Sequence, residues 1–145
     1  MYSTQRKTLM SVSALVVLAS AYGAVSIGAP AMDTPAMLSG TQEVPPVQTA
    51  ASASSSIAVA EDMTVTGSVV TADIQSTNAH IHQGAVGVSG PVVVTLVKTA
   101  EQQWSVPANT KLTAEQYKSY KAGDFYVNVH SAAHKDGEIR LQLKP

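Results

Sequence analysis

The sequence contains no cysteine, and this absence excludes two common arrangements of small exported proteins. Disulfide bonds cannot cross-link the chain, and a lipoprotein anchor, which needs a cysteine at its cleavage site, cannot form. Stability must therefore come from an apolar core, to which a bound metal ion or oligomerisation can add. A single domain of about 110 residues can bury such a core.

Charged residues are also scarce, at 13% of the 145 residues, against about 25% in an average globular protein. Part of the shortfall lies in residues 1–31, where Arg6 and Lys7 are the only charges. They precede the apolar run 14–19, which is too short to span a bilayer. This pattern predicts a secretory signal peptide, cleaved after Ala21 or, preferably, Ala31. We therefore expect a periplasmic or secreted protein without a stable membrane anchor.

Basic residues remain few after this segment is removed. Loss of Arg6 and Lys7 changes the formal net charge from −1 to about −3. A mildly acidic domain has no electrostatic footprint for nucleic acid, and it is not attracted to anionic membrane surfaces. Its oligomeric state is left open by the sequence.

The mature chain divides into a short linker, residues 32–37, and one domain, residues 38–145. The domain consists of short runs rich in Val, Ile and Thr, separated by Gly, Asn, Asp and Ser. Residues 56–60 and 63–70 predict a hairpin with a turn at Glu61-Asp62. Residues 38–46 predict an edge strand that ends in a turn, because Pro45 and Pro46 cannot lie in a central strand.

The second half of the domain continues this pattern. The apolar run 92–97 predicts a strand that is covered on both faces. Residues 112–121 predict the one short helix, capped by Thr113 and ended by Gly123. Two further strands are predicted at 125–130 and 138–143. Together the segments predict an all-β fold, an immunoglobulin-like or Greek-key β-sandwich or barrel with one short helix.

All four histidines lie in two local pairs, His80 with His82 and His130 with His134. The first two are separated by one residue on a predicted strand, so their side chains project from the same face about 7 Å apart. On the strand 125–130, Val127 and Val129 belong to the core face, which places His130 on the opposite one. If the two strands are neighbours, three imidazoles converge on one outer surface patch.

Three imidazoles without thiolates favour copper or zinc over calcium and magnesium, which prefer oxygen ligands. The candidate metal ligands are therefore His80, His82, His130 and His134. The last lies in a predicted loop, where it either completes the ligand set or is simply solvated. Alternatively, His80, His82 and His130 are ordinary polar residues on the protein surface and bind no metal.

Other motifs give weaker signals. Glycines 84, 87 and 90 are predicted to form turns, because no helix follows them and a phosphate loop needs a helix N-terminus. Arg140 is expected to pair with Glu138 across the sheet or to be solvated, or else to guide an anion toward a nearby metal. No nucleophile elbow or Ser/His/Asp arrangement is present, so catalytic residues are not predicted.

Five blocks of the sequence, in order, resemble the CHRD (chordin) domain family. They cover residues 38–144 and consist of Leu38-Ser39-Gly40-Thr41-Gln42-Glu43-Val44-Pro45-Pro46, Ala79-His80-Ile81-His82-Gln83-Gly84 with Gly90-Pro91-Val92-Val93, Leu112-Thr113, Ala122-Gly123-Asp124-Phe125-Tyr126-Val127-Asn128-Val129-His130, and Gly137-Glu138-Ile139-Arg140-Leu141-Gln142-Leu143. The resemblance implies an immunoglobulin-like β-barrel in an exported protein. The His-x-His strand with a distant strand-borne histidine is also similar to the copper ligands of Cu,Zn superoxide dismutases.

These observations lead to three hypotheses of different classes. The first is an exported CHRD domain that binds copper, or zinc, in metal sequestration or delivery. The second is a metal-free extracellular adhesion or protein-interaction module, whose partner is another exported protein. The third is a superoxide dismutase-like redox enzyme, although similarity of fold does not establish an activity. Enzymatic activity is the less favoured of these expectations.

Overall fold

The computed structural model describes residues 35–145, so the predicted signal peptide, residues 1–31, lies outside the described residues. The described chain contains eleven β-strands, one 3-10 helix and one α-helix. In chain order they are β1 (Ala36–Leu38), η1 (Gly40–Gln42), β2 (Ser52–Ser55), β3 (Ala58–Val59), β4 (Val65–Thr66), β5 (Ser68–Ala72), β6 (Ser76–Gln83), β7 (Val92–Thr95), β8 (Val97–Ala100), β9 (Gln103–Ser105), α1 (Ala114–Lys121), β10 (Phe125–Ser131) and β11 (Ile139–Gln142). The predicted all-β fold with one short helix is confirmed.

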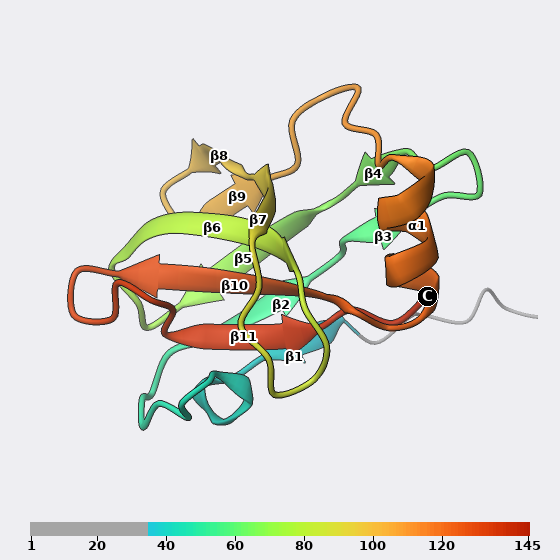
Figure 1. Ribbon diagram of the computed structural model, residues 1–145. Coiled ribbons are helices and arrows are strands. Elements are labelled where there is room, and N and C mark those ends of the chain that lie inside the picture. Colours follow the sequence, from blue (N-terminus) through green and yellow to red (C-terminus); the bar gives the residue numbers. More distant parts are fainter. Residues whose placement is uncertain (1–34) are drawn as a thin grey trace, which may run out of the picture. The chain divides into compact units, whose positions relative to one another are not determined.

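Two antiparallel sheets pack face to face (Figure 1). One has the strand order β1-β2-β5-β9-β8 and the other β11-β10-β6-β7, while β3 and β4 form a separate hairpin. The sheets are joined at one edge by paired backbone bonds between Ser39 and Arg140, with N···O distances of 3.1 and 3.0 Å. At the other edge the chain passes directly from β7 to β8 through Leu96. These links give the sandwich a barrel-like closure.

The apolar core lies between the two sheets, and β10 crosses its centre. Phe125, Val127 and Val129 point inward from β10 and are at most 1% exposed. Alternation would leave the other face of β10 to solvent, yet all seven residues of this strand are buried. The face is less exposed than the predicted outer surface patch, because loops cover much of it: His82 and His130 are buried and His80 is half-buried.

The apolar run 92–97 is not the doubly covered strand that its composition predicts. Val92 is 49% exposed and Val97 is 47% exposed. The run is divided at Leu96, which is buried, because β7 is an edge strand of one sheet and β8 an edge strand of the other. In β7 only Val94 is fully buried, and all four residues of β8 are exposed, so the run combines two edge strands with the crossover between them.

Local sequence signals determine the helix as predicted. The Thr113 hydroxyl accepts a hydrogen bond from the Gln116 backbone N–H at 3.1 Å, and the Gln116 side chain accepts one from the Thr113 N–H at 2.9 Å. This capping box satisfies two otherwise unpaired donors of the first turn. Gly123, with φ of +86°, follows the last turn in a left-handed conformation that favours glycine.

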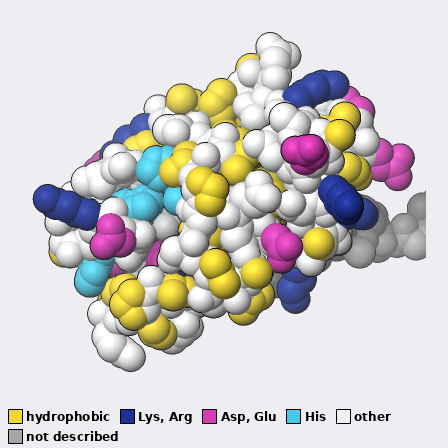
Figure 2. Space-filling model, in the orientation of Figure 1, with side chains coloured by type: hydrophobic (Ala, Val, Ile, Leu, Met, Phe, Trp, Pro, Cys, Tyr) yellow, Lys and Arg dark blue, Asp and Glu magenta, His cyan; other side chains and the backbone are white. Residues whose placement is uncertain are grey.

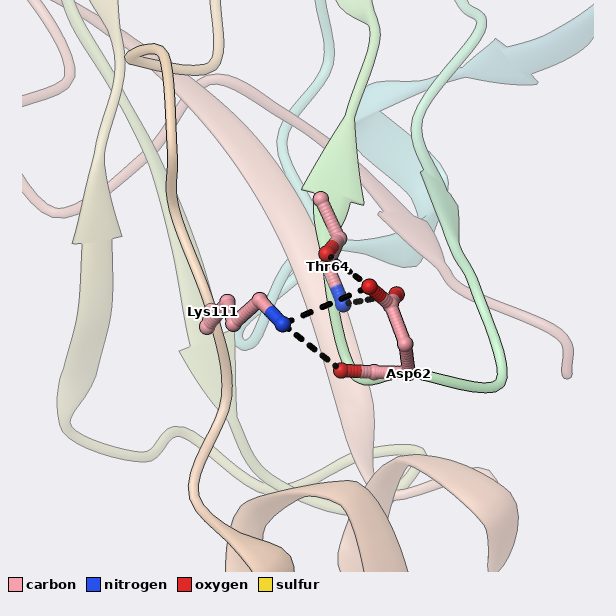
Figure 3. A network of polar contacts seen from close by, with 3 residues as sticks. All are labelled: Asp62, Thr64 and Lys111. Carbon is pink, nitrogen blue, oxygen red and sulfur yellow. Dashed lines mark hydrogen bonds and ion pairs between the residues drawn. The ribbon is translucent and has the colours of Figure 1, made fainter.

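The predicted hairpin is present as β3 and β4, with the turn at Glu61-Asp62. Asp62 accepts bonds from the backbone N–H and the hydroxyl of Thr64, and it forms an ion pair with Lys111 at 3.3 Å (Figure 3). Both charged side chains are well exposed, so this ion pair contributes little to stability. The first strand of the domain, β1, begins at Ala36, two residues before the predicted start of the domain at Leu38.

Candidate metal centre

The pairing of β6 with β10 brings histidines from distant parts of the sequence to one face of a sheet. His80 lies opposite Asn128 and His82 opposite Tyr126, while His130 lies opposite Asn78. In each strand, alternate side chains point to the same face. The face of the four-stranded sheet that is turned away from the core therefore presents His80, His82 and His130 together, as the alternation in the sequence predicts.

The three imidazoles are close enough to share an ion. Each offers one ring nitrogen, and these atoms all lie within 4.8 Å of one another. The shortest separation joins His80 Nδ1 and His130 Nε2, at 2.9 Å. Metal–nitrogen bonds of about 2 Å allow one ion to join nitrogens up to about 4 Å apart. The ring nitrogens of the three histidines are between 2.9 and 4.8 Å apart, so a shift of less than about 1 Å brings all of them within this limit.

Backbone carbonyls orient two of the rings. His82 Nδ1 lies 2.9 Å from the Gly90 carbonyl oxygen, and His130 Nδ1 lies 2.9 Å from the Lys135 carbonyl oxygen. A carbonyl oxygen only accepts, so both Nδ1 atoms carry the proton and both Nε2 atoms are unprotonated. His130 Nε2 accepts a hydrogen bond from His80 Nδ1, which a bound metal ion would replace. His82 Nε2 is buried and has no hydrogen-bond partner among the described residues. Metal-binding histidines show this same arrangement of one ring nitrogen on a carbonyl.

Burial keeps the imidazoles neutral. It lowers the pKa of His80 to about 4, with a further contribution from the neighbouring His130 and His82. Burial also lowers the pKa of His82 and that of His130, although the carbonyl that each ring donates to acts in the opposite direction. Neutral imidazole is the form that binds metal ions, so the site is ready for a cation at neutral pH.

Arg140 is a structural part of this centre, and the predicted pairing with Glu138 was wrong. Its guanidinium carbon lies 3.4 Å from the Tyr126 ring centroid, and the residue is 2% exposed. Glu138 instead accepts a hydrogen bond from the Thr49 hydroxyl at 2.6 Å. The reason is that β11 brings Arg140 onto the histidine face, beneath a loop that supplies carbonyl acceptors.

That loop joins β6 to β7 and passes across β10 and β11 (Figure 1). Arg140 donates to the carbonyl oxygens of Val88 and Ala85, at 3.1 and 3.0 Å, and the Tyr126 hydroxyl accepts from the Gly90 N–H at 3.1 Å. A Cβ on Gly90 would overlap the Gln83 carbonyl. The glycine thus permits the close approach that brings its carbonyl to His82.

His134 is placed apart from the three strand-borne histidines. It is half-buried in the β10–β11 loop, where its backbone N–H donates to the Ser131 hydroxyl at 3.2 Å. It is not part of the group of nitrogens that lie within 4.8 Å. Figure 2 shows histidine side chains reaching the surface on the face in view, beside apolar and acidic groups.

Two further polar residues beside this face were assigned no role from the sequence. Glu43 and Asn128 are 6% and 2% exposed, and each has one side-chain oxygen without a hydrogen-bond partner in the described chain. Burial raises the pKa of Glu43 to about 7, although the charge of Arg140 opposes the rise. Alternation placed Asn128 beside His130, but no local pattern connects Glu43 with a strand some eighty positions away.

Comparison with known protein families matches residues 34–143 to the CHRD domain. Neither the curated proteins nor the solved structures include a match to this chain. Within residues 35–145, no helix is long and apolar enough to cross a membrane.

Proposed function

The chain belongs to the CHRD domain family, and we propose that it is an exported module that binds one copper ion through His80, His82 and His130. Family membership supports an extracellular-type module. The observation that carries the proposal is the convergence of three neutral ring nitrogens, one of them buried without a hydrogen-bond partner. A cation would supply the missing partner of His82 Nε2.

The donor set favours copper or zinc. The chain has no cysteine, and the group of close ligand atoms contains imidazoles alone. Imidazole suits both ions, whereas calcium and magnesium require oxygen ligands. Among divalent ions of the first transition row, copper binds a given nitrogen site most tightly. We therefore propose copper as the preferred ion and zinc as its competitor.

Sequestration or delivery of copper fits the surroundings better than a dismutase-like reaction. That reaction was suggested by the similarity of the histidines to the copper ligands of Cu,Zn superoxide dismutases, and it needs an arginine that is free to guide an anion to the metal. Arg140 is 2% exposed, and its guanidinium group binds the carbonyl oxygens of Val88 and Ala85 and the Gln142 side chain. Its donors stabilise the loop and do not face a substrate.

A metal-free interaction module is the second candidate function. The loop that covers the histidine face exposes apolar side chains, with Val86 78% and Val88 52% exposed. Exposed apolar groups of this kind are common where proteins meet. In the copper proposal the same two valines would contact the exported protein that supplies or receives the ion.

Electron paramagnetic resonance tests the ligand set directly. Purified full-length protein loaded with one equivalent of Cu(II) should show splitting from several equivalent nitrogens, and His130→Ala should reduce the number of coupled nitrogens. His134→Ala is the matched control and should leave the spectrum unchanged. A spectrum that is identical in wild type and His130→Ala would contradict the proposed ligands.

Export is tested separately. N-terminal sequencing of the protein from its native compartment should show a chain that begins after Ala21 or Ala31. Recovery of the uncleaved chain from the cytoplasm would contradict this part of the proposal, while the copper site would be unaffected.

A further inference from the structure

A cleft of about 350 Å³ opens beside the histidine centre, between the segment that follows η1 and the β6–β7 loop. Its lining residues come from the segment after η1, from β6, from the β6–β7 loop, from β10 and from the β10–β11 loop: Glu43, Val44, Pro45, His82, Ser89, Gly90, Tyr126, Asn128 and Asp136. Of these, only His82 belongs to the proposed copper ligands. The cleft therefore shares one side chain with the copper site and is otherwise lined by different residues.

Buried polar atoms without partners gather in this cleft. In residues 35–145 there are three such side-chain atoms, Glu43 Oε1, Asn128 Oδ1 and His82 Nε2, and all three belong to lining residues. Leaving a buried acceptor unpaired is costly. A metal ion at the histidine centre would satisfy His82 Nε2, but the two oxygens would remain without a donor. The Asn128 side chain lies beside both Glu43 and His82 and influences their pKa values by hydrogen bonding, yet within the described chain no donor is in hydrogen-bond geometry to Glu43 Oε1 or Asn128 Oδ1.

The charge of the cleft indicates a cationic donor. Glu43 forms no ion pair within the described chain, where the one salt bridge joins Lys111 to Asp62. Arg140 attracts Glu43 at longer range, but its guanidinium is bound to loop carbonyls. Asp136 adds a second carboxylate to the lining. Buried carboxylates are normally paired with a cation.

Gly137 lies against the two side chains that carry the unpaired oxygens, and its lack of a side chain leaves room for them. A Cβ on this glycine would overlap Glu43 Oε1 and lie 2.7 Å from Asn128 Nδ2. The Asn128 amide group also points its Nδ2 toward the Asp136 carbonyl oxygen, at 3.5 Å, which leaves Oδ1 as the open acceptor. The Glu43 carboxyl group and the Nδ2 side of the Asn128 amide group are thus packed close to the Gly137 backbone, which limits the movement of both side chains.

Apolar side chains complete the lining. Val44 and Pro45 are exposed at the mouth, and Tyr126 forms part of the wall. A ligand that matches this combination has a positively charged donor head and a short hydrocarbon stem. We propose that the cleft binds a primary alkylammonium group, with its N–H donors on Glu43 Oε1 and Asn128 Oδ1 and its stem against Val44 and Pro45.

Nuclear magnetic resonance of the metal-free, 15N-labelled full chain tests this proposal without any contribution from metal coordination. Butylammonium should shift the Asn128 side-chain NH2 signals saturably, whereas butanol and butyrate of the same chain length should not. Glu43→Gln should weaken the apparent affinity for butylammonium at least tenfold. Glu101→Gln, which removes an exposed carboxylate elsewhere, is the matched control and should leave it unchanged.

Equal responses to the amine, the alcohol and the carboxylate would mean that the cleft holds solvent alone, and would overturn the proposal. Calcium chloride that reproduces the Asn128 shift where butylammonium does not would overturn it in favour of a metal ion. If Glu43→Gln does not fold, wild-type protein still gives a decisive comparison. Affinity should rise from methylammonium to butylammonium, and the absence of a rise would contradict packing of the stem against Val44 and Pro45.

Discussion

The Tyr126 ring lies parallel to the His82 imidazole, with 4.7 Å between the ring centroids and 3° between the planes. Arg140 approaches the same tyrosine ring at 3.4 Å. Because β6 and β11 flank β10 on opposite sides, imidazole, phenol and guanidinium form one continuous stack across three strands. The stack connects a proposed copper ligand to the loop that orients it.

Arg140→Met should destabilise the protein and weaken copper binding together. The variant keeps much of the apolar volume but leaves the Val88 and Ala85 carbonyl oxygens without their donor. Loss of charged hydrogen bonds of this kind costs about 3 kcal/mol, and disturbed support of a metal ligand lowers affinity roughly 10- to 100-fold. Urea unfolding and a chelator competition measure the two effects.

Lys121→Met is the control for this experiment, because it removes an exposed charge at the end of α1. It should change the unfolding free energy by less than about 0.5 kcal/mol. Equal stability of the Arg140 and Lys121 variants would show that the stack does not support the loop.

Gly137→Ala and Gly87→Ala compare two glycines of positive φ, of which only Gly137 is in contact with the cleft side chains. Both glycines have positive φ, +133° and +76°, so alanine is strained at either position. A Cβ at Gly87 meets nothing within 4 Å, whereas one at Gly137 overlaps Glu43 and crowds Asn128. Gly87→Ala should cost about 1 kcal/mol, and Gly137→Ala about 2 kcal/mol more.

Thermal and urea unfolding of the two glycine variants would measure this difference. A Gly137 variant that is no less stable than the Gly87 variant would show that Glu43 and Asn128 are free to move aside. The rigid placement of the two oxygens in the cleft would then be incorrect.

The histidines and Glu43 should affect the pH dependence of stability in opposite directions. The pKa of His80 falls from 6.5 to about 4 on folding, so the unfolded chain binds more protons between these values and stability rises with pH there. The pKa of Glu43 rises from 4.5 to about 7. Its contribution is complete below pH 4.5 and is lost as the pH rises to about 7.

Glu43→Gln isolates the second contribution in the metal-free protein. Because glutamine does not ionise, the unfolding free energy of the variant relative to wild type should increase steadily from pH 4.5 to 7. Glu101→Gln should show no such trend. A relative stability of Glu43→Gln that is constant or falls across this window would contradict the raised pKa of the buried carboxyl group.

The sequence predicted the parts of this molecule that depend on local patterns. Alternation placed His80, His82 and His130 on one face, and the capping residue Thr113 and Gly123 bounded the helix. The covering of that face could not be predicted, because it depends on Arg140 meeting carbonyls of a loop more than fifty positions away. The crossover at Leu96 was missed for a related reason, since an apolar run does not reveal that its two halves join different sheets.

The central claim is that His80, His82 and His130 form one copper site, and titration of purified full-length protein with Cu(II) against a competing chelator tests it most directly. Wild type and His134→Ala should bind one equivalent with the same affinity, within about twofold. The triple variant His80→Ala/His82→Ala/His130→Ala, checked for folding by its strand signal in circular dichroism, should lose at least 100-fold in affinity. Equal, weak binding by wild type and the triple variant would contradict the account.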